Sequence, residues 1–358
     1  MSRISKRAHC GVLGAVLCGV CISAVASAFE VGEAFQRPAL VSSQTSQAVL
    51  LGSAITGSKR LVAVGERGLV LLSDDGGNHW RQAVVPSSVT LTSVRFAGEQ
   101  GVAVGHSGVV LTSVDGGEHW LLRLDGRRAA ELALRDAQDA GDPVAISTAQ
   151  QLVQDGPDKP FLDAAISSNG RLLVVGAYGM IFASPDLGQS WTPWMARIDN
   201  PDGLHIYAIR QLDNEILLAG ERGLVLRSTD NGATFKHLPT PYNGSLFTAE
   251  LPDQQNIVVA GLKGSLLRSH DGGENWEMLA SADASSFTGS TLSADGSLYL
   301  VTQAGHLLGL NSDGLVQLSQ QPMPSLNSVS LVNAHSVLLL SSRGWMTVQL
   351  DGRIEGTK

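Results

Sequence analysis

One pattern recurs seven times along the 358 residues of this chain and constrains its fold more than any other feature. Each copy has two apolar runs joined by a short glycine-bounded turn, as in LVAVGERGLVLLSDDGGNHW (61–80) and GVAVGHSGVVLTSVDGGEHW (101–120). The second glycine of that turn falls at Gly68, Gly108, Gly179, Gly223, Gly264, Gly305 and Gly344, so the spacings run from 39 to 44 residues, except one of 71. Such a period is typical of a four-stranded propeller blade, whereas helical repeats would show a 3.6-residue periodicity. The sequence therefore predicts an all-β, seven-bladed β-propeller.

Each blade is expected to be an antiparallel meander of four strands. Residues 91–97 (LTSVRFA) alternate as a half-buried first strand requires, and the second and third strands meet at a turn such as 65–68. Radial repetition hides most sheet edges. We expect residues 35–41 to add the outer strand of the last blade and so close the ring.

The one long spacing predicts a helical insert between blades 2 and 3, at about residues 124–160. Residues 127–140 (RRAAELALRDAQDA) favour a helix, and Asp142 followed by Pro143 supplies the N-cap and first-turn proline of a second helix through Val153. Three roles stay open for this insert: a lid, a docking element for a partner, or an elaborated loop without function.

Residues 1–28 have the pattern of a secretory signal peptide. Three basic residues precede an apolar run at 11–25, and Ala-Ser-Ala at 26–28 fits the small-x-small cleavage site. The apolar run is shorter than the roughly 20 residues of a spanning helix. We therefore expect the propeller, residues 29–358, to be exported to the periplasm, or to a thylakoid lumen in a photosynthetic cell, without a transmembrane segment. All three cysteines lie in the leader, which excludes disulfides and thiolate metal sites in the mature chain.

Five copies carry the motif Ser-x-Asp-x-Gly-x-x-aromatic between the third and fourth strands. Its Asp and aromatic positions are Asp75/Trp80, Asp115/Trp120, Asp186/Trp191, Asp230/Phe235 and Asp271/Trp276. The Asp is expected to accept main-chain N–H bonds within its own turn, while the aromatic ring folds back over the hairpin and is buried there. Five equivalent catalytic sites around one ring make no chemical sense, so these residues are interpreted as structural. The sixth and seventh copies lack the aromatic residue.

This motif resembles that of the bacterial neuraminidase-type (Asp-box) propellers and, within them, the photosystem II stability/assembly factor family. The lines VGERGLVLLSDDGGNHW and VGHSGVVLTSVDGGEHW carry the resemblance, which extends over nearly the whole mature chain except residues 124–160. It implies a lumenal or periplasmic seven-bladed propeller that assists assembly of a membrane complex and has no known catalysis. Relatives also occur in non-photosynthetic bacteria, some beside genes for resistance-nodulation-division exporters, so the resemblance does not by itself establish photosynthesis.

The turns between second and third strands should share one face of the ring with the connections between blades. The residue before the second glycine of each turn is Arg67, Ser107, Tyr178, Arg222, Lys263, Ala304 or Arg343. Four of these seven are basic, although the mature chain has 22 basic against 33 acidic residues, a net charge of −11. One interpretation is that these are ordinary solvated turns, with Glu66 and Glu221 neutralising the adjacent arginines. The other is a positive crown that binds carboxylates or phosphates of a partner.

The partner-binding residues that we predict are Arg67, Arg222, Lys263, Arg343, Tyr178 and His106. The expected partner is a membrane protein complex or an exporter subunit, and the protein is expected to be a monomer without a cofactor. An acidic chain binds nucleic acid poorly. No metal-ligand spacing such as HxH or HExxH is present.

The alternative function is a sialidase-like glycoside hydrolase or a glycan-binding propeller. Sialidases need an arginine triad and a Tyr nucleophile with a Glu partner, but the usual Phe-Arg-Ile-Pro motif has only a distorted counterpart at 35–38. Tyr178, Tyr207 and Tyr242 are candidate tyrosines without a diagnostic spacing to a carboxylate. Other Asp-box glycosidases use two carboxylates across a cleft, which the sequence does not exclude.

Overall fold

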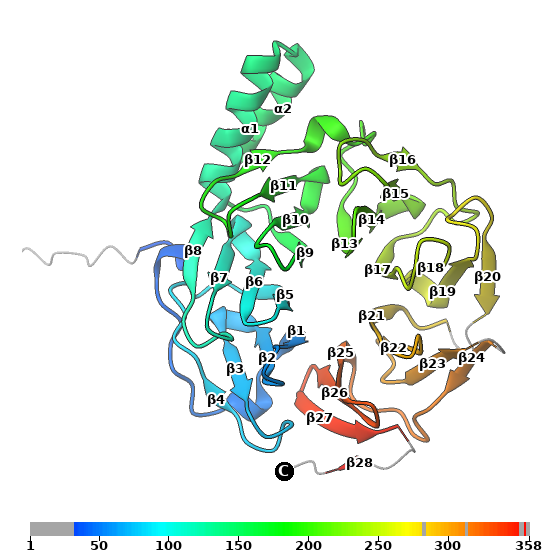
Figure 1. The fold of residues 1–358 in the computed structure, drawn as a ribbon. Coiled ribbons are helices and arrows are strands. Elements are labelled where there is room, and N and C mark those ends of the chain that lie inside the picture. Colours follow the sequence, from blue (N-terminus) through cyan, green and yellow to red (C-terminus); the bar gives the residue numbers. More distant parts are fainter. Residues whose placement is uncertain (1–31, 281–283, 312–313, 351–353, 356–358) are drawn as a thin grey trace, which may run out of the picture. The chain divides into compact units, whose positions relative to one another are not determined.

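Seven four-stranded antiparallel sheets are arranged around a central opening (Figure 1). The computed structural model describes residues 32–280, 284–311, 314–350 and 354–355. The propeller unit begins at Glu33. The predicted signal peptide, residues 1–28, lies outside the described residues. The predicted all-β, seven-bladed propeller is confirmed.

Every blade is a meander of four consecutive strands. Blade 1 consists of β1 (Leu50–Ile55), β2 (Leu61–Gly65), β3 (Val70–Ser73) and β4 (Arg81–Gln82), and blade 2 of β5 (Leu91–Ala97), β6 (Gln100–Gly105), β7 (Val110–Ser113) and β8 (Leu121–Leu124). Blade 3 consists of β9 (Phe161–Ile166), β10 (Leu172–Gly176), β11 (Ile181–Ser184) and β12 (Thr192–Pro193), and blade 4 of β13 (Ile206–Leu212), β14 (Glu215–Gly220), β15 (Val225–Ser228) and β16 (Lys236–His237).

The remaining blades follow the same order. Blade 5 consists of β17 (Leu246–Glu250), β18 (Ile257–Gly261), β19 (Ser265–Ser269) and β20 (Glu277–Ala280). Blade 6 consists of β21 (Phe287–Leu292), β22 (Leu298–Thr302), β23 (Leu307–Asn311) and β24 (Gly314–Gln317), and blade 7 of β25 (Leu326–Asn333), β26 (Ser336–Ser341), β27 (Gly344–Gln349) and β28 (Ile354–Glu355). The second strands are buried almost throughout, because both faces of each blade pack on a neighbouring blade.

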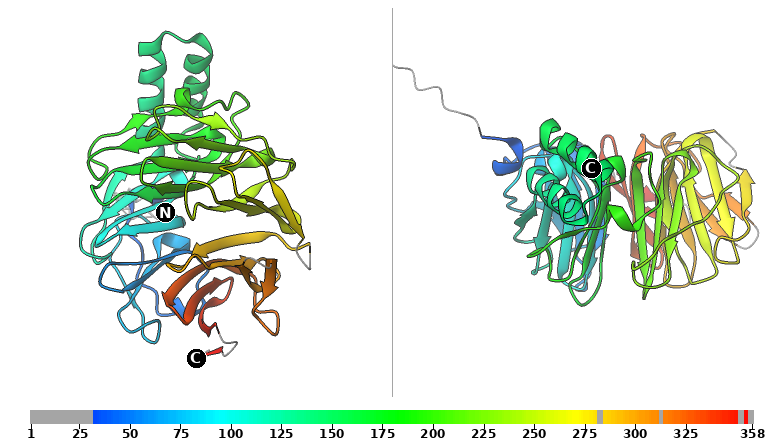
Figure 2. Two further views of the ribbon diagram at one scale, coloured as in Figure 1. Left: turned by 45° about the vertical axis from the view of Figure 1, so that its right-hand side comes forward. Right: turned by 90° about the horizontal axis from the view of Figure 1, so that it is seen from above.

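Two helices form the insert between blades 2 and 3. They are α1 (Gly126–Ala140) and α2 (Pro143–Asp155), and Asp125 and Asp142 cap them by accepting hydrogen bonds from main-chain N–H groups of the first turn. Alanines of α1 such as Ala133 share an apolar cluster with Phe182 and Trp191 of blade 3. The hairpin projects outward from the rim of the ring and does not extend over the central opening (Figures 1 and 2). This position rules out the lid that the sequence left open.

Blade 7 takes none of its strands from the N-terminal part of the chain. The expectation that residues 35–41 form its outer strand is therefore wrong. The outer strand of blade 7 is β28, which comes from the C-terminal part of the chain itself. Phe35 instead lies buried in the apolar core shared by blades 1 and 2. Blades 7 and 1 meet through side chains: the hydroxyls of Ser53 and Ser330 lie 2.8 Å apart, and Asn327 Nδ2 donates to Leu50 O at 2.9 Å.

The propeller has two different faces. We call the face that carries the turns between second and third strands the turn face, and the opposite one the Asp-box face. On the turn face, each turn packs on the connection to the next blade. Gly68 shows how closely: its φ is +74°, and a Cβ there would lie 2.0 Å from Ser87 O. On the Asp-box face, the motif loops bond to the turns between first and second strands, as in Gly116 N–H to Glu99 O at 3.0 Å. The predicted assignment of faces is therefore correct.

Candidate functional site

The turns on the turn face present side chains from an unusual backbone conformation. Residues at the turn tips of five blades adopt left-handed geometry with φ between 51° and 57°: Arg67, Ser107, Tyr178, Arg222 and Lys263. Non-glycine residues rarely adopt this conformation. The four residues with long side chains in this set are exposed, as is Arg343 in blade 7. One position of the repeat thus places four cationic side chains around one face.

The glutamates beside two of these arginines do not pair with them. Glu221 Oε2 accepts the main-chain N–H of His205 at 3.0 Å, and Glu66 Oε1 accepts that of Val49 at 3.4 Å. Each carboxylate therefore bonds to the segment that enters its blade. The structure corrects the interpretation in which these glutamates neutralise Arg67 and Arg222.

We call Arg67, Arg222, Lys263 and Arg343 the crown cations. They have almost no ion-pair partners. Arg222 Nη1 lies 3.5 Å from Asp202 Oδ2, and both side chains are 69% exposed. Such an exposed pair contributes little free energy. Within the described part of the chain, Arg67, Lys263 and Arg343 form no ion pair. The face is therefore able to offer charge to an incoming anion without first breaking strong internal contacts.

Tyr178 connects the insert to this face. Its ring centroid lies 4.9 Å from Lys159 Nζ and 5.0 Å from the ring of His205. Lys159 in turn pairs with Asp155 at 2.9 Å and with Asp158 at 2.7 Å. These contacts fix the C-terminal end of α2 against blade 3.

The predicted residues are spread around the rim. His106 begins the corresponding turn of blade 2 and is exposed, and its imidazole forms no hydrogen bond with the residues described. Arg67, His106, Tyr178, Arg222, Lys263 and Arg343 therefore come from blades 1, 2, 3, 4, 5 and 7. They form a ring of separate contact points, suited to an extended partner and not to one small ligand.

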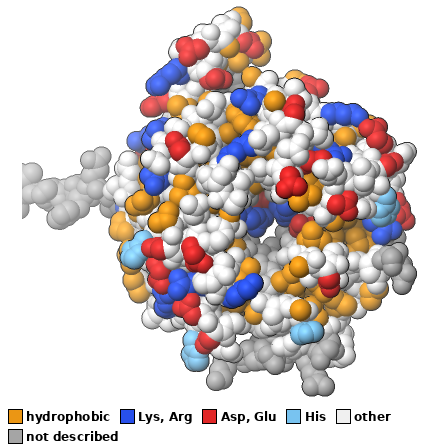
Figure 3. All heavy atoms as spheres, viewed as in Figure 1, with side chains coloured by type: hydrophobic (Ala, Val, Ile, Leu, Met, Phe, Trp, Pro, Cys, Tyr) orange, Lys and Arg blue, Asp and Glu red, His pale blue; other side chains and the backbone are white. Residues whose placement is uncertain are grey.

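The sequence analysis missed a charged network in the central channel. The first strands of all seven blades line this channel, which has a cavity volume of about 450 Å³, and basic side chains are visible inside the opening (Figure 3). Asp163 on β9 lies 2.9 Å from Arg95 of β5 and 2.8 Å from Arg210 of β13. Arg210 also lies 3.3 Å from Glu250 of β17. The period-2 pattern of each first strand would have identified these channel-facing positions.

The channel carboxylates are poorly suited to acid catalysis. Burial raises the pKa of Asp163, but the charges of Arg95 and Arg210 and a hydrogen bond from Ser93 outweigh it, so the pKa is lowered overall. Glu250 accepts a hydrogen bond from Ser290 at 2.6 Å besides its contact with Arg210. A glycosidase general acid needs a raised pKa.

Tyr207 also lines the channel mouth. Its ring lies 5.1 Å from that of Phe247, edge to face. Burial and the charge of Glu221 raise its pKa, against a hydrogen bond from Ser245 that lowers it. A sialidase-like tyrosine nucleophile would need the opposite shift, toward an easily deprotonated phenol.

The Asp-box serines and aspartates are engaged in hydrogen bonds within their own loops. In blade 1, Ser73 Oγ donates to Asp75 Oδ1 at 2.9 Å, and Asp75 Oδ1 accepts the His79 N–H at 2.9 Å. The pKa of Asp75 is lowered to about 2, chiefly by the His79 main-chain bond. Equivalent serine-to-aspartate bonds occur in the other four motif loops, which accounts for the polar part of the motif by loop geometry.

The aromatic residues of the motif fold over their own loops in the first three blades, and those of blades 2 and 3 are buried as expected. The indole N–H of Trp80 donates to Gly77 O at 2.8 Å, and Trp120 and Trp191 make the same bond to the glycines of their own loops. Trp120 is 4% exposed and Trp191 is 6% exposed, whereas Trp80 is partly buried. In these loops the ring therefore folds over its own glycine, as the sequence predicted.

The expectation of a buried ring is wrong for Trp80, Phe235 and Trp276, and the last two also lack the bond to the glycine of their own loop. The side chains of Phe235 and Trp276 are only partly buried, at the edge of apolar clusters of blades 4 and 5. Phe235 has no N–H to donate, and Trp276 Nε1 forms no hydrogen bond within the described residues.

Side chains from the preceding blade lie close to the motif glycines of blades 4 and 5. A Cβ added at the motif glycine of blade 4, Gly232, would lie 2.2 Å from the ring of Trp194, and one at Gly273 in blade 5 would lie 2.4 Å from Leu238. Trp194 and Leu238 directly follow β12 and β16, the outer strands of blades 3 and 4. Each occupies the space beside the motif glycine of the next blade. In these two blades a side chain from the preceding blade thus takes the place beside the glycine, a result that the repeat alone does not predict.

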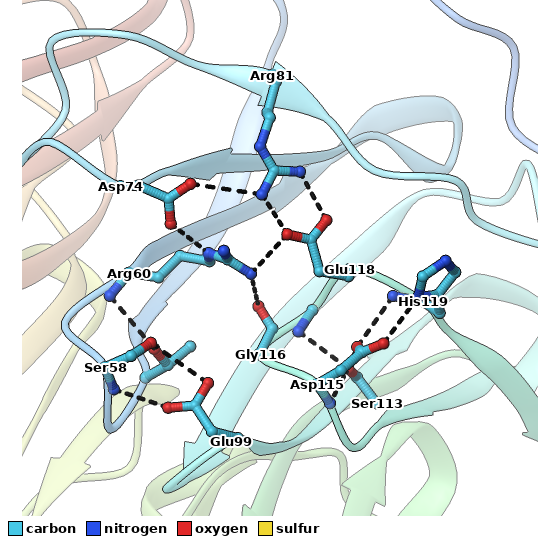
Figure 4. A network of polar contacts seen from close by, with 12 residues as sticks. Ser58, Arg60, Asp74, Arg81, Glu99, Ser113, Asp115, Gly116, Glu118 and His119 are labelled. Carbon is cyan, nitrogen blue, oxygen red and sulfur yellow. Dashed lines mark hydrogen bonds and ion pairs between the residues drawn. The ribbon is translucent and has the colours of Figure 1, made fainter.

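A polar network joins blades 1 and 2 on the Asp-box face (Figure 4). Arg60 bonds to Asp74 at 2.5 Å and lies 2.9 Å from Glu118, and Arg81 bonds to both carboxylates. Figure 4 shows the side chains turned toward one another, so this network holds the two loops together.

Neither a metal site nor a membrane span is evident in the described ranges. They contain no group of three or more His, Cys, Asp or Glu side chains placed to hold a metal ion. No helix among the residues described is long and apolar enough to cross a membrane.

Comparison with known proteins gives a family and several similar structures. Residues 40–151 match the family described as "Photosynthesis system II assembly factor YCF48", while no curated protein matches the sequence. The structure of YCF48 from Cyanidioschyzon merolae has a TM-score of 0.62 and 15% identity, and the match covers 87% of this chain and 98% of that one. A structure of YCF48 bound to D1 peptide has a TM-score of 0.63 and 16% identity, and the match again covers 87% of this chain and 98% of that one.

A glycoside hydrolase shares the fold as well. The enzyme NkGH74 from Niastella koreensis has a TM-score of 0.56 and 15% identity, over 86% of this chain and 44% of that one. At such identities, the structural likenesses establish the fold alone. The family match over residues 40–151, on a seven-bladed ring, supports the resemblance to photosystem II assembly factor-like β-propellers that the sequence indicated.

Proposed function

We propose that this protein is a non-catalytic assembly or accessory factor that docks onto a membrane protein complex through its turn face. One observation carries the proposal. The carboxylates of Glu66 and Glu221 accept hydrogen bonds from main-chain N–H groups, and this leaves the adjacent arginines available. Arginine binds carboxylates through two parallel hydrogen bonds. An acidic segment of the partner is therefore the expected ligand of the crown.

The comparisons support this proposal. The matched family consists of assembly factors, and one similar structure holds a D1 peptide. The leader pattern of residues 1–28 supports export to the periplasm, or to a thylakoid lumen in a photosynthetic cell. In a non-photosynthetic cell, we propose that the partner is a subunit of a resistance-nodulation-division type exporter.

Hydrolase activity is not part of the proposal. Both channel carboxylates contact Arg210, and the pKa of Asp163 is lowered. A glycan array and a hydrolase assay with sialosides and β-glucans test the alternative. Turnover that is lost in an Asp163→Asn or Glu250→Gln variant that remains folded would contradict the non-catalytic role.

The decisive experiment is affinity capture from gently solubilised membranes of the source cell, read by mass spectrometry. The test variant is Arg222→Glu/Arg343→Glu, and the control Lys59→Glu/Lys236→Glu makes the same charge change at exposed sites away from the turn face. We expect one membrane complex to be captured by wild type and control and lost with the test variant. Capture that survives in the test variant, or no specific capture by wild type, would refute the docking function.

A further inference from the structure

The segment that we expected to complete blade 7 instead builds one wall of a groove on the turn face of blade 1. We define the strap as residues 37–48. Together with Glu66, Arg67, Leu69 and Ser88, strap residues enclose a groove of about 840 Å³. The groove is separate from the central channel, since none of these residues lines the channel.

The strap is held in place at several points. Upstream of it, Phe35 is 2% exposed and lies in the core between blades 1 and 2. Ala39 N–H donates to Val85 O at 2.9 Å. Gln82 bonds to the strap twice, from Nε2 to Leu40 O and from Ser42 N–H to Oε1, both at 2.9 Å. The groove wall is therefore preformed, which lowers the entropic cost of binding.

The strap nevertheless exposes two large apolar side chains. Leu40 is 85% exposed and Val41 is 86% exposed, and both line the groove. Adjacent exposed apolar residues that a fold holds in position are characteristic of contact surfaces. Nothing in the packing of blade 1 requires these side chains to be apolar, since they contribute nothing to its core.

The charge of the groove favours an anionic occupant. Arg37 and Arg67 line it, and neither forms an ion pair within the described ranges. The single carboxylate in the lining, that of Glu66, already accepts the N–H of Val49 at 3.4 Å. The lining thus carries a net charge of +1 beside an apolar wall, and the two cations are free to take up a carboxylate.

The main chain of the strap favours a peptide over a lipid or a small acid. In the part of the chain described, no hydrogen bond reaches the N–H groups of Leu40 and Val41 or the carbonyl of Val41. These groups are able to pair with the main chain of an extended peptide, as in recognition by added strands. We propose that this groove binds an extended peptide segment in which an apolar side chain neighbours a carboxylate. The inference rests on the proposed docking function and names the chemistry of the segment recognised at Arg67.

The test is selection of random hexapeptides displayed on phage against the mature chain, followed by fluorescence anisotropy of the selected peptides. The groove variant is Leu40→Ser/Val41→Ser/Arg67→Gln. A matched control, Val114→Ser/Val144→Ser/Arg128→Gln, makes the same kinds of change at exposed residues elsewhere. Because all six side chains are exposed, both variants are expected to fold.

We expect wild type and control to select peptides that pair apolar residues with Asp or Glu. Affinity should fall at least about tenfold in the groove variant, and it should weaken with added salt. No enrichment over the groove variant, or selection of neutral or basic peptides, would overturn the inference. If phosphatidylglycerol vesicles bind in a way that needs Leu40 and Val41 while no peptide binds, the groove is assigned to a lipid instead. If the wild type forms a dimer that the groove variant loses, the groove is assigned to a second copy of the chain.

Two outcomes separate this inference from the docking function. If membrane capture depends on Arg222 and Arg343 but the groove variant captures the complex as wild type does, the groove inference fails and the docking function stands. If wild type captures no membrane complex, the docking function fails, and the peptide selection still decides the groove.

Discussion

Replacement of Asp163 by Asn should destabilise the propeller strongly, because it removes one charge from the buried network in the channel. Asp163 is 5% exposed and contacts Arg95 at 2.9 Å and Arg210 at 2.8 Å. Breaking a buried pair by removing one partner costs about 3–5 kcal/mol. Asn retains an acceptor for the Ser93 hydroxyl, and Arg210 retains Glu250. We therefore expect the lower value, about 3 kcal/mol.

The assay is urea denaturation followed by tryptophan fluorescence, together with calorimetry. For a unit of this length, about 3 kcal/mol corresponds to a fall in Tm of about 4–5 °C. The folded-state pKa of Asp163 lies below its ordinary value, so the stability that its charge contributes is complete above the unfolded pKa of about 3.9 and is lost as pH falls through the folded pKa. The difference between wild type and variant should thus be constant from about pH 5 to 8 and narrow below about pH 4.

A surface ion pair provides the matched control. Asp158 lies 2.7 Å from Lys159 but is 60% exposed, so Asp158→Asn should change stability by less than about 0.5 kcal/mol. If Asp163→Asn costs no more than Asp158→Asn, or if its effect is equally large at pH 3 and pH 7, the reasoning on the channel network is wrong.

Three further predictions concern the fold and the motif. Trp120 is 4% exposed, so Trp120→Ala should lower the free energy of unfolding by about 3–5 kcal/mol in the same urea assay; a loss below about 1 kcal/mol would contradict its structural role. Gly68→Ala forces a Cβ to within 2.0 Å of Ser87 O, whereas Gly98 has a φ of +63° and nothing within 4 Å, so calorimetry should show a much lower Tm for Gly68→Ala than for Gly98→Ala. The pKa of Asp230 is lowered to about 2 by hydrogen bonds from Thr234, so NMR titration should find its carboxyl ionised at pH 3; a midpoint near 4 would show that those bonds do not persist in solution.

Much of the architecture was predictable because it depends on local sequence patterns that repeat along the chain. The seven glycine-bounded turns, the alternation of residues 91–97 and the Asp-box motif each follow from short-range sequence, and together they predict blades, their number and the two faces. The helices of the insert were predictable for the same reason, since Asp142 followed by Pro143 is a local start signal. The candidate cations could likewise be found by position, because they occupy one place in each repeat.

What the sequence did not reveal are relations between distant segments. Whether Glu66 neutralises Arg67 depends on the main chain at Val49, which only the folded blade brings beside it. The channel network likewise joins residues of four blades, and its pKa shifts arise from burial that no single repeat contains. The surroundings of a motif glycine also depend on the preceding blade, which supplies the side chain beside Gly232 and Gly273.

The N-terminal segment shows the same division. The sequence predicted a strand at 35–41 because a closed ring needs an outer strand somewhere, but residues 354–355 already supply it. Local sequence therefore determined the blades, since strands and turns depend on neighbouring residues. Tertiary structure decided the closure, the groove beside Arg67 and the charge available on the turn face, because each depends on which distant groups the ring places in contact.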